Sequence, residues 1–157
     1  MLALYFAPDS SSMAPHIALH ELGLAFDARP ISFARKQNRE PANLAINPEG
    51  KVPRRRWYRG CPSSPPWCTR RGARGRRMRG ATYALAERRL GERRWAVGDR
   101  MSIADIHLFR LYWRFRNAVR PAPGEFPRLE AHHDRMMARP AVRHTCAVEA
   151  ALGYELP

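Results

Sequence analysis

Residues 2–23 read LALYFAPDSSSMAPHIALHELG, and this stretch decides how the chain begins to fold. Leu2 to Phe6 form a short apolar run typical of a strand, which ends just before a proline. Ser10 to Ser12 stand where the N-cap of a helix belongs, and Pro15 suits a first helical turn because its missing amide hydrogen is not needed there. Gly23 is a natural C-terminal stop. The stretch therefore predicts a strand followed by a helix.

A second stretch of strand type runs from Phe26 to Phe33, and turn-forming residues follow it. A polar connection at 35–39 leads to one or two expected helical turns at 41–46. Residues 47–53, Asn-Pro-Glu-Gly-Lys-Val-Pro, then combine turn chemistry with an X-Pro bond. Strand, helix and strand in this order indicate a βαβ unit.

Residues 81–157 have helical patterning. Their clearest signal is a capping box formed by Ser102 and Asp105, with Met101 and Ile106 spaced for a hydrophobic staple. The helix that starts here is apolar on most sides to about residue 116, which is typical of a buried central helix. Three further helices are expected, at 81–90, 126–139 and 141–152.

The positive charge of the chain is concentrated in its middle. The 157 residues carry 28 Lys and Arg against 14 Asp and Glu, a formal net charge of +14. Residues 54–80 hold ten arginines and no acid, so the remainder has 18 basic and 14 acidic residues and a net charge of +4. These 27 residues show neither a strand nor a helix period, and we expect them to be irregular or disordered.

An arginine-rich segment with interspersed aromatic residues suggests an alternative function. Its guanidinium groups could contact phosphates while Trp57, Tyr58 and Trp67 stack on bases. The chain would then be a non-catalytic basic fragment that binds nucleic acid without specificity. No recognition fold accompanies the charge, so we rank this alternative second.

Composition excludes other classes of protein. No run of about 18 apolar residues is present, and the N-terminus lacks the features of a signal peptide, so we expect neither a membrane span nor export. Three cysteines, an odd number, argue against a disulfide framework and favour a reducing cytoplasm.

His16 and His20 have a spacing compatible with zinc but no apparent third ligand, so no metal is expected. We expect Cys146 to pack as a small apolar residue and His132-His133 to lie on an exposed helix face.

The Ser10-Ser11-Ser12 cluster is the best candidate for chemistry. Free amides and the positive end of the helix dipole favour an anion there, and a hydroxyl can donate a hydrogen bond to a thiolate. No His-Asp pair flanks the cluster, which gives a serine hydrolase little support. The structural alternative, that the serines only cap the helix, is favoured by position alone.

Three motifs in this order resemble those of bacterial glutathione transferases. Residues 4–19, LYFAPDSSSMAPHIAL, look like the opening of these enzymes, and residues 47–53 look like their turn before a cis-proline. Residues 98–105, GDRMSIAD, are similar to the capping-box motif of their helical domain. The resemblance covers residues 1–53 and 81–157 and is closest to the beta-like bacterial class.

The resemblance implies a thioredoxin-like N-terminal domain, partial at residues 1–53, and a glutathione S-transferase-type all-α C-terminal domain, partial at 81–157. It implies glutathione as co-substrate, bound between the domains, and a cytoplasmic detoxification enzyme that is usually a homodimer. Ser11 would hold the glutathione thiolate, with Ser10 or Ser12 as close substitutes. Further glutathione contacts would come from Lys36, Val52 and Pro53. The thiolate would attack an electrophilic small molecule, or reduce a peroxide or mixed disulfide.

The sequence departs from the family pattern after Pro53. In the family a β-hairpin, an acidic-serine pair that binds the γ-glutamyl group and the helices of the dimer interface follow, and this chain has residues 54–80 instead. An Arg-Gly-Pro-Cys-Trp mixture without acids is what a G+C-rich gene gives in the wrong frame. Our hypothesis is that the middle of the chain is missing or out of frame, and reading the coding DNA in the other two frames tests it.

Overall fold

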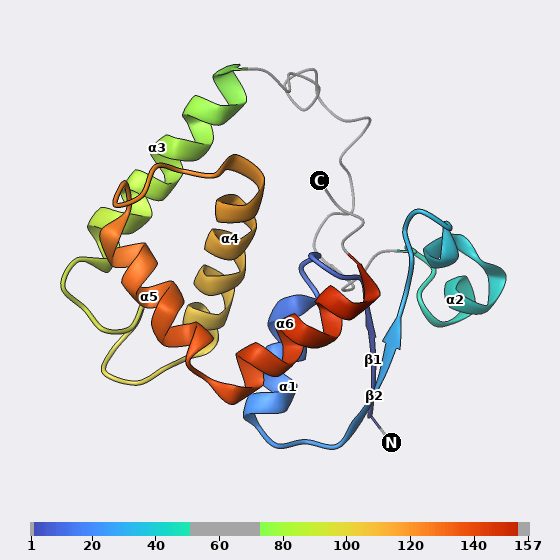
Figure 1. The fold of residues 1–157 in the computed structure, drawn as a ribbon. Coiled ribbons are helices and arrows are strands. Elements are labelled where there is room, and N and C mark those ends of the chain that lie inside the picture. Colours follow the sequence, from blue (N-terminus) through green and yellow to red (C-terminus); the bar gives the residue numbers. More distant parts are fainter. Residues whose placement is uncertain (1, 51–72, 154–157) are drawn as a thin grey trace.

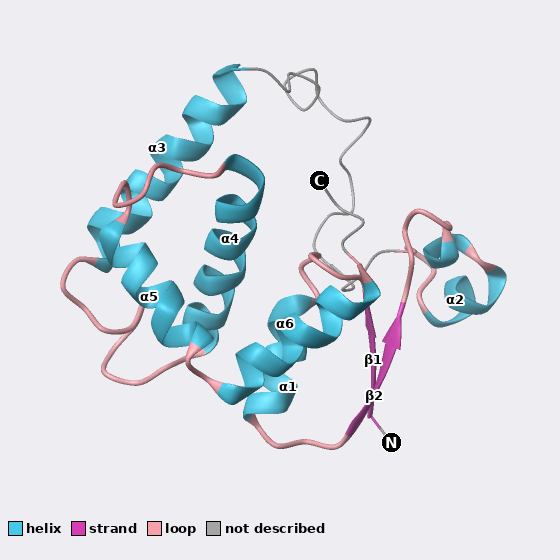
Figure 2. Cartoon of the chain, viewed as in Figure 1, coloured by secondary structure: helices cyan, strands magenta, loops and turns pink. Residues whose placement is uncertain are grey.

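The computed structural model describes residues 2–50 and 73–153, and it confirms the α/β start and the helical remainder (Figures 1 and 2). The N-terminal part is a short β-α-β unit, and an all-helical domain follows, in the order that the resemblance implies. In chain order the elements are β1 (Leu2–Phe6), α1 (Met13–Glu21), β2 (Phe26–Pro30), the 3₁₀ turn η1 (Gln37–Arg39), α2 (Pro41–Ile46), α3 (Ala73–Leu90), α4 (Ile103–Val119), α5 (Pro127–Met137) and α6 (Pro140–Leu152).

The two strands pair in parallel, and α1 makes the crossover between them. Their register places Leu2 opposite Phe26 and Phe6 opposite Pro30. Gly23 ends α1 as expected, because its φ of +63° is the left-handed conformation that favours glycine. In this parallel arrangement the loops that follow β1 and β2 leave the same edge of the sheet.

One sequence expectation is wrong at its C-terminal end. Residues 73–80 were expected to be irregular, but α3 begins at Ala73 and continues to Leu90. Arg and Ala are among the better helix formers, and the two interior glycines, Gly75 and Gly80, cost about 1 kcal/mol each, so composition supports a helix here without an apolar stripe. The rest of the arginine-rich segment, together with Val52 and Pro53, falls on residues 51–72, which lie outside the described residues.

Helix α4 joins the two parts of the molecule. It contributes Ile106 and Phe109 to a cluster shared with α1, α5 and α6, and Tyr112 and Phe115 to a second cluster shared with α3 and α5. Burial of a large apolar side chain contributes roughly 1.5–3 kcal/mol. The first cluster therefore docks the βαβ unit firmly on the helical domain, and Figure 1 shows α1 and α6 side by side at this junction.

The expected central position of α4 is confirmed, but only one of its faces is buried. Ile103 and Leu111, which looked like core residues in the sequence, are 56% and 44% exposed.

The capping box at the start of α4 is present. The Ser102 hydroxyl accepts from the Ala104 amide at 3.3 Å, and Asp105 Oδ2 accepts from the Ser102 amide at 2.9 Å. The buried Asp105 carboxylate also accepts from the Ala96 amide at 2.7 Å and contacts His132 Nε2 at 3.0 Å. Asp105 of the capping box therefore holds the loop before α4 and the middle of α5 against the N-terminal end of α4.

The expectation of an exposed His132-His133 face is wrong, because the two side chains are 1% and 7% exposed. Together with Leu129 and Met136 they form the buried face of α5, at the helical spacing i, i+3, i+4, i+7. Asp105 gives His132 its polar partner, and the His133 ring stacks on Phe109 with centroids 5.3 Å apart. Cys146, as expected, packs against the first apolar cluster.

Within residues 2–50 and 73–153, none of the helices is both long enough and apolar enough to cross a membrane.

Candidate active site

The loop between β1 and α1 brings Ser10, Ser11 and Ser12 together at the carboxyl edge of the sheet. Ser12 is fully buried, and its Oγ accepts from the Ala7 amide and donates to the Ala7 carbonyl, both at 3.1 Å. Because that hydroxyl proton goes to Ala7, the 2.5 Å contact with Ser12 Oγ takes its proton from Ser10. Ser10 Oγ in turn accepts from the Ser12 amide at 3.1 Å. The hydroxyls of Ser10 and Ser12 thus form hydrogen bonds within the loop.

The structural alternative for the serines, side-chain capping of α1, does not hold for Ser12. Ser12 occupies the N-cap position, but its φ of −71° and ψ of −18° are already helical and its side chain caps no amide of the helix. An N-cap side chain reaches the helix amides from an extended backbone, and the Ser12 backbone is not extended. The hydroxyl closes the loop onto Ala7 instead.

Ser11 differs from both neighbours. Its side chain is half-buried, and within the described residues no hydrogen bond uses its hydroxyl. It stands one residue before the N-cap of α1, next to the amides and the positive dipole end of that helix. Among the described residues, two serine hydroxyls therefore hold the loop in shape, and the Ser11 hydroxyl makes no hydrogen bond.

Two side chains from the helical domain hold this loop, and neither is among the candidate residues predicted from the sequence. Glu149 of α6 accepts from the Asp9 amide through Oε2 at 3.0 Å, and its Oε1 lies 3.3 Å from His16 Nδ1 on α1. Glu149 and His16 are 0% and 1% exposed. Arg114 of α4 donates to the Asp9 carbonyl at 3.0 Å. A signal for Glu149 exists in the sequence, because it shares a helical stripe with the buried Val142 and Thr145.

Asp9 adopts a left-handed backbone with φ of +59°, which Asp tolerates better than most residues. Burial raises the pKa of the Asp9 carboxyl, and the nearby Glu149 acts in the same direction, while the Arg114 and Arg110 guanidinium groups oppose the rise.

The remaining candidates for glutathione contact have different positions. Lys36 is exposed and lies after β2, with φ of +56°, on a connection that leaves the same sheet edge as the serine loop. Val52 and Pro53 lie outside the described residues. No group of three or more His, Cys, Asp or Glu that could hold a metal ion occurs in the described ranges, and the rings of His16 and His20 pack against each other with centroids 5.2 Å apart.

Comparison with known proteins identifies the fold. Residues 74–140 match the family model "Glutathione S-transferase, C-terminal domain". A glutathione S-transferase from Xylella fastidiosa superposes with a TM-score of 0.78 at 19% identity, covering 96% of this chain and 99% of that one. A sphingomonad glutathione S-transferase complexed with glutathione gives 0.72 at 20% identity, with 95% and 99% covered. The bacterial beta class enzyme of Sphingomonas chungbukensis gives 0.72 at 21% identity, with 94% and 98% covered.

A comparison with curated protein sequences finds no match. Residues 74–140 thus resemble the helical domain of glutathione S-transferases, and the described residues have the fold of these proteins.

Proposed function

We propose that the chain is a glutathione transferase that binds glutathione at the serine loop and joins its sulfur to electrophilic small molecules. This proposal rests on the different hydrogen bonding of the three serines. The hydroxyls of Ser10 and Ser12 bond within the loop and hold its shape, whereas the Ser11 hydroxyl is available to a ligand. The glutathione bound to the sphingomonad enzyme supports the choice of co-substrate.

The chemistry follows from the position of Ser11. A thiol has an ordinary pKa of about 8.5, and the thiolate is the nucleophile. A hydroxyl that donates to the sulfur and a helix N-terminus behind it both favour the charged form and lower the thiol pKa. The thiolate then forms a bond to an electrophilic carbon, and the leaving group departs with its electron pair.

Lys36, Val52 and Pro53 complete the proposed glutathione site. By resemblance to the family, Lys36 pairs with the glycine carboxylate, and Val52, before a cis-proline at Pro53, pairs its backbone with the cysteinyl unit. We also propose, on the same resemblance, that residues 1–53 are the glutathione-binding domain and that 81–157 belong to the helical domain, whose first helix, α3, begins at Ala73.

The braces on the loop support a catalytic role for it. A hydroxyl stabilises a thiolate effectively only if it is already held in position, because ordering a mobile donor costs conformational entropy when the hydrogen bond forms. Contacts of Asp9 with Glu149 and Arg114 fix the backbone two residues before Ser11 from two different helices.

We assign the activity to the cytoplasm, where thiols remain reduced.

Two measurements test the proposal. Calorimetry with reduced glutathione should show binding, and an absorbance assay with a chlorinated dinitrobenzene should show glutathione-dependent conjugation. Retention on heparin that collapses with salt, in the absence of glutathione binding, would instead support the nucleic-acid-binding alternative.

A further inference from the structure

Three histidine rings are in successive contact where α1 meets α6, and the proposed reaction does not account for them. His16 and His20 lie one turn apart on α1, with ring centroids 5.2 Å apart. The ring of His144 on α6 stands nearly perpendicular to that of His20, with centroids 4.6 Å apart. Phe26 of β2 packs edge-on against His20 at 4.9 Å. Rings from three elements, α1, α6 and β2, therefore meet at His20.

The groups that face His20 favour its neutral form. Burial lowers the pKa of His20, and the nearby His16 and His144 act in the same direction. His20 is half-buried and His144 is exposed, so water reaches this pair. Two positive charges on rings 4.6 Å apart are closer than the Debye length of about 8 Å at physiological ionic strength, so salt screens them little. Protonation of both rings therefore pushes α1 and α6 apart.

The two carboxylates of the junction are engaged elsewhere. Glu149 Oε1 lies 3.3 Å from His16 Nδ1. Glu21 accepts two hydrogen bonds of 2.6 Å from Arg139, the N-cap of α6. Within the described part of the chain, neither carboxylate forms a hydrogen bond with the other two histidines, so neither neutralises a proton that they take up.

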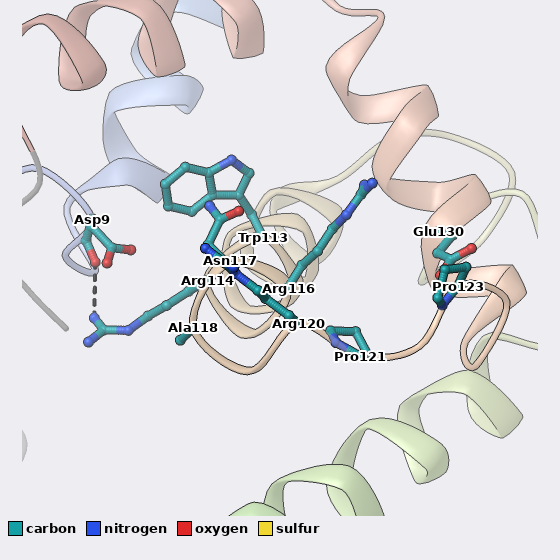
Figure 3. A pocket seen from close by; sticks show the side chains of 10 residues that line it. All are labelled: Asp9, Trp113, Arg114, Arg116, Asn117, Ala118, Arg120, Pro121, Pro123 and Glu130. Atoms are coloured by element: carbon teal, nitrogen blue, oxygen red, sulfur yellow. Dashed lines mark hydrogen bonds between the residues drawn. The ribbon is translucent and has the colours of Figure 1, made fainter.

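The contact between α1 and α6 also affects the serine loop. Helix α1 starts directly after Ser12, and Glu149 of α6 accepts from the Asp9 amide at 3.0 Å. Separation of α6 from α1 therefore weakens this bond. The second contact with Asp9 is the hydrogen bond from Arg114 of α4 to the Asp9 carbonyl, which Figure 3 shows. Arginine keeps its charge in mild acid, so this second contact persists.

We propose that His20 and His144 form a pH-sensitive switch between the βαβ unit and the helical domain. The junction is closed while both rings are neutral, and repulsion between the two protonated rings opens it. Histidine has an unfolded-state pKa of about 6.5 and the folded value of His20 is lower, so this stabilisation is present above about pH 6.5 and is lost as the pH falls toward the folded value. The switch requires neither glutathione nor Ser11, and its test is separate from that of the proposed function.

Hydrogen exchange of backbone amides in the full chain tests the switch. Protection factors, which correct for the intrinsic pH dependence of exchange, are measured at pH 7.5 and pH 5.5 without glutathione. We expect protection in α1 and α6 to fall about 10-fold more than protection in α4. Acid effects of His132 and His133 on α5 reach α4, which packs against α5, so the α4 reference corrects for them.

Two variants remove the titrating groups one at a time. His20→Phe keeps an aromatic ring beside Phe26 and His144 but takes up no proton, so the additional loss in α1 and α6 should shrink below about 2-fold. His144→Gln, at an exposed position, should shrink it in the same way and gives the readout if His20→Phe does not fold.

A matched control removes a histidine that lies away from the junction. His107→Gln, at an exposed position of α4, should leave the additional loss at about 10-fold. No additional loss in the wild type, or an equal additional loss in the wild type, His20→Phe and His144→Gln, would overturn the proposal.

Discussion

The carboxylate of Glu149 accepts a hydrogen bond from the Asp9 amide at 3.0 Å, although 140 residues separate them in the sequence. The same carboxylate contacts His16 on the helix that follows the serine loop. One buried side chain of the last helix thus ties together both sides of the loop that carries Ser11. The helical domain therefore does more than cover the βαβ unit, because it sets the backbone of the candidate active site.

Removal of the Glu149 carboxylate should lower the stability of the fold. Glu149→Ala leaves the Asp9 amide and His16 without their buried partner, and we expect a loss of roughly 3 kcal/mol in the free energy of unfolding. Glu149→Gln retains one oxygen for the Asp9 amide and should lose about half as much. Urea denaturation measures both. Glu92→Ala, at an exposed side chain, is the control, and a loss at Glu149 no larger than at Glu92 would refute the bracing role.

Ser12→Ala should act on stability rather than on chemistry. The substitution leaves the Ala7 amide and carbonyl inside the loop without their described side-chain partner, so a loss of about 1–3 kcal/mol is expected in the same urea measurement. Ser11→Ala should cost less than about 0.5 kcal/mol, because its hydroxyl makes no hydrogen bond within residues 2–50 and 73–153. The reverse order of the two losses would contradict the assignment of Ser12 to structure and Ser11 to ligand.

Acidification should destabilise the fold through buried histidines. Burial lowers the pKa of His132 and of His133, with Asp105 and Asp134 respectively opposing the shift. A folded pKa below the unfolded value of about 6.5 means that the unfolded chain takes up protons first. The stability that these neutral histidines contribute is present above pH 6.5 and is lost as the pH falls toward the folded pKa.

His132→Gln tests this pH dependence. Glutamine offers an amide donor to Asp105 near the place of Nε2 but does not titrate, so the loss of stability between pH 7.5 and pH 5.5 should shrink by on the order of 1 kcal/mol. Urea denaturation at the two pH values gives the comparison, and His107→Gln, at an exposed histidine of α4, serves as the control. An unchanged pH dependence in His132→Gln would count against the buried histidine as its source.

Asp105 should contribute to the pH dependence at still lower pH. Burial alone raises the pKa of its carboxyl, but hydrogen bonds from the Ala96 and Ser102 amides and from His132 outweigh it and lower the pKa below the ordinary value. The stabilising effect of this carboxylate is therefore present above about pH 4 and disappears as the pH falls through the lowered pKa. Asp105→Asn should remove the part of the acid transition below pH 4, as followed by circular dichroism. If the acid transition of Asp105→Asn had the same midpoint as that of the wild type, the stabilising role of the Asp105 carboxylate would be contradicted.

Much of the fold could be predicted because its signals are local. The apolar run Leu2–Phe6, the Ser102–Asp105 box and the proline-separated helices α5 and α6 follow from patterns of a few residues. The start of α3 at Ala73 is not predictable from hydrophobic periodicity, because residues 73–80 have helix-forming composition but no apolar stripe. The burial of His132 and His133 was missed although their spacing from Leu129 and Met136 indicated it.

The candidate site was only partly predictable for a different reason. The serine cluster is contiguous in the sequence, so its place between strand and helix was evident. Which serine hydroxyls are used inside the loop depends on Ala7, and the side chains of Glu149 and Arg114, which bond to Asp9, lie more than a hundred residues away. The helical stripe of α6 indicates that Glu149 is buried, but its contact with Asp9 leaves no local pattern, and only the folded chain brings the two residues together.

The pKa of the glutathione thiol in its complex with the protein tests the central claim most directly. Thiolate absorbance near 240 nm, followed through a pH titration of the complex, reports this pKa. The account predicts a bound thiol pKa at least about one unit below that of free glutathione in the wild-type chain. In Ser11→Ala the value should return toward that of the free thiol while glutathione still binds. Equal thiol pKa values in the wild type and in Ser11→Ala, or no binding of glutathione to the wild type, would contradict it.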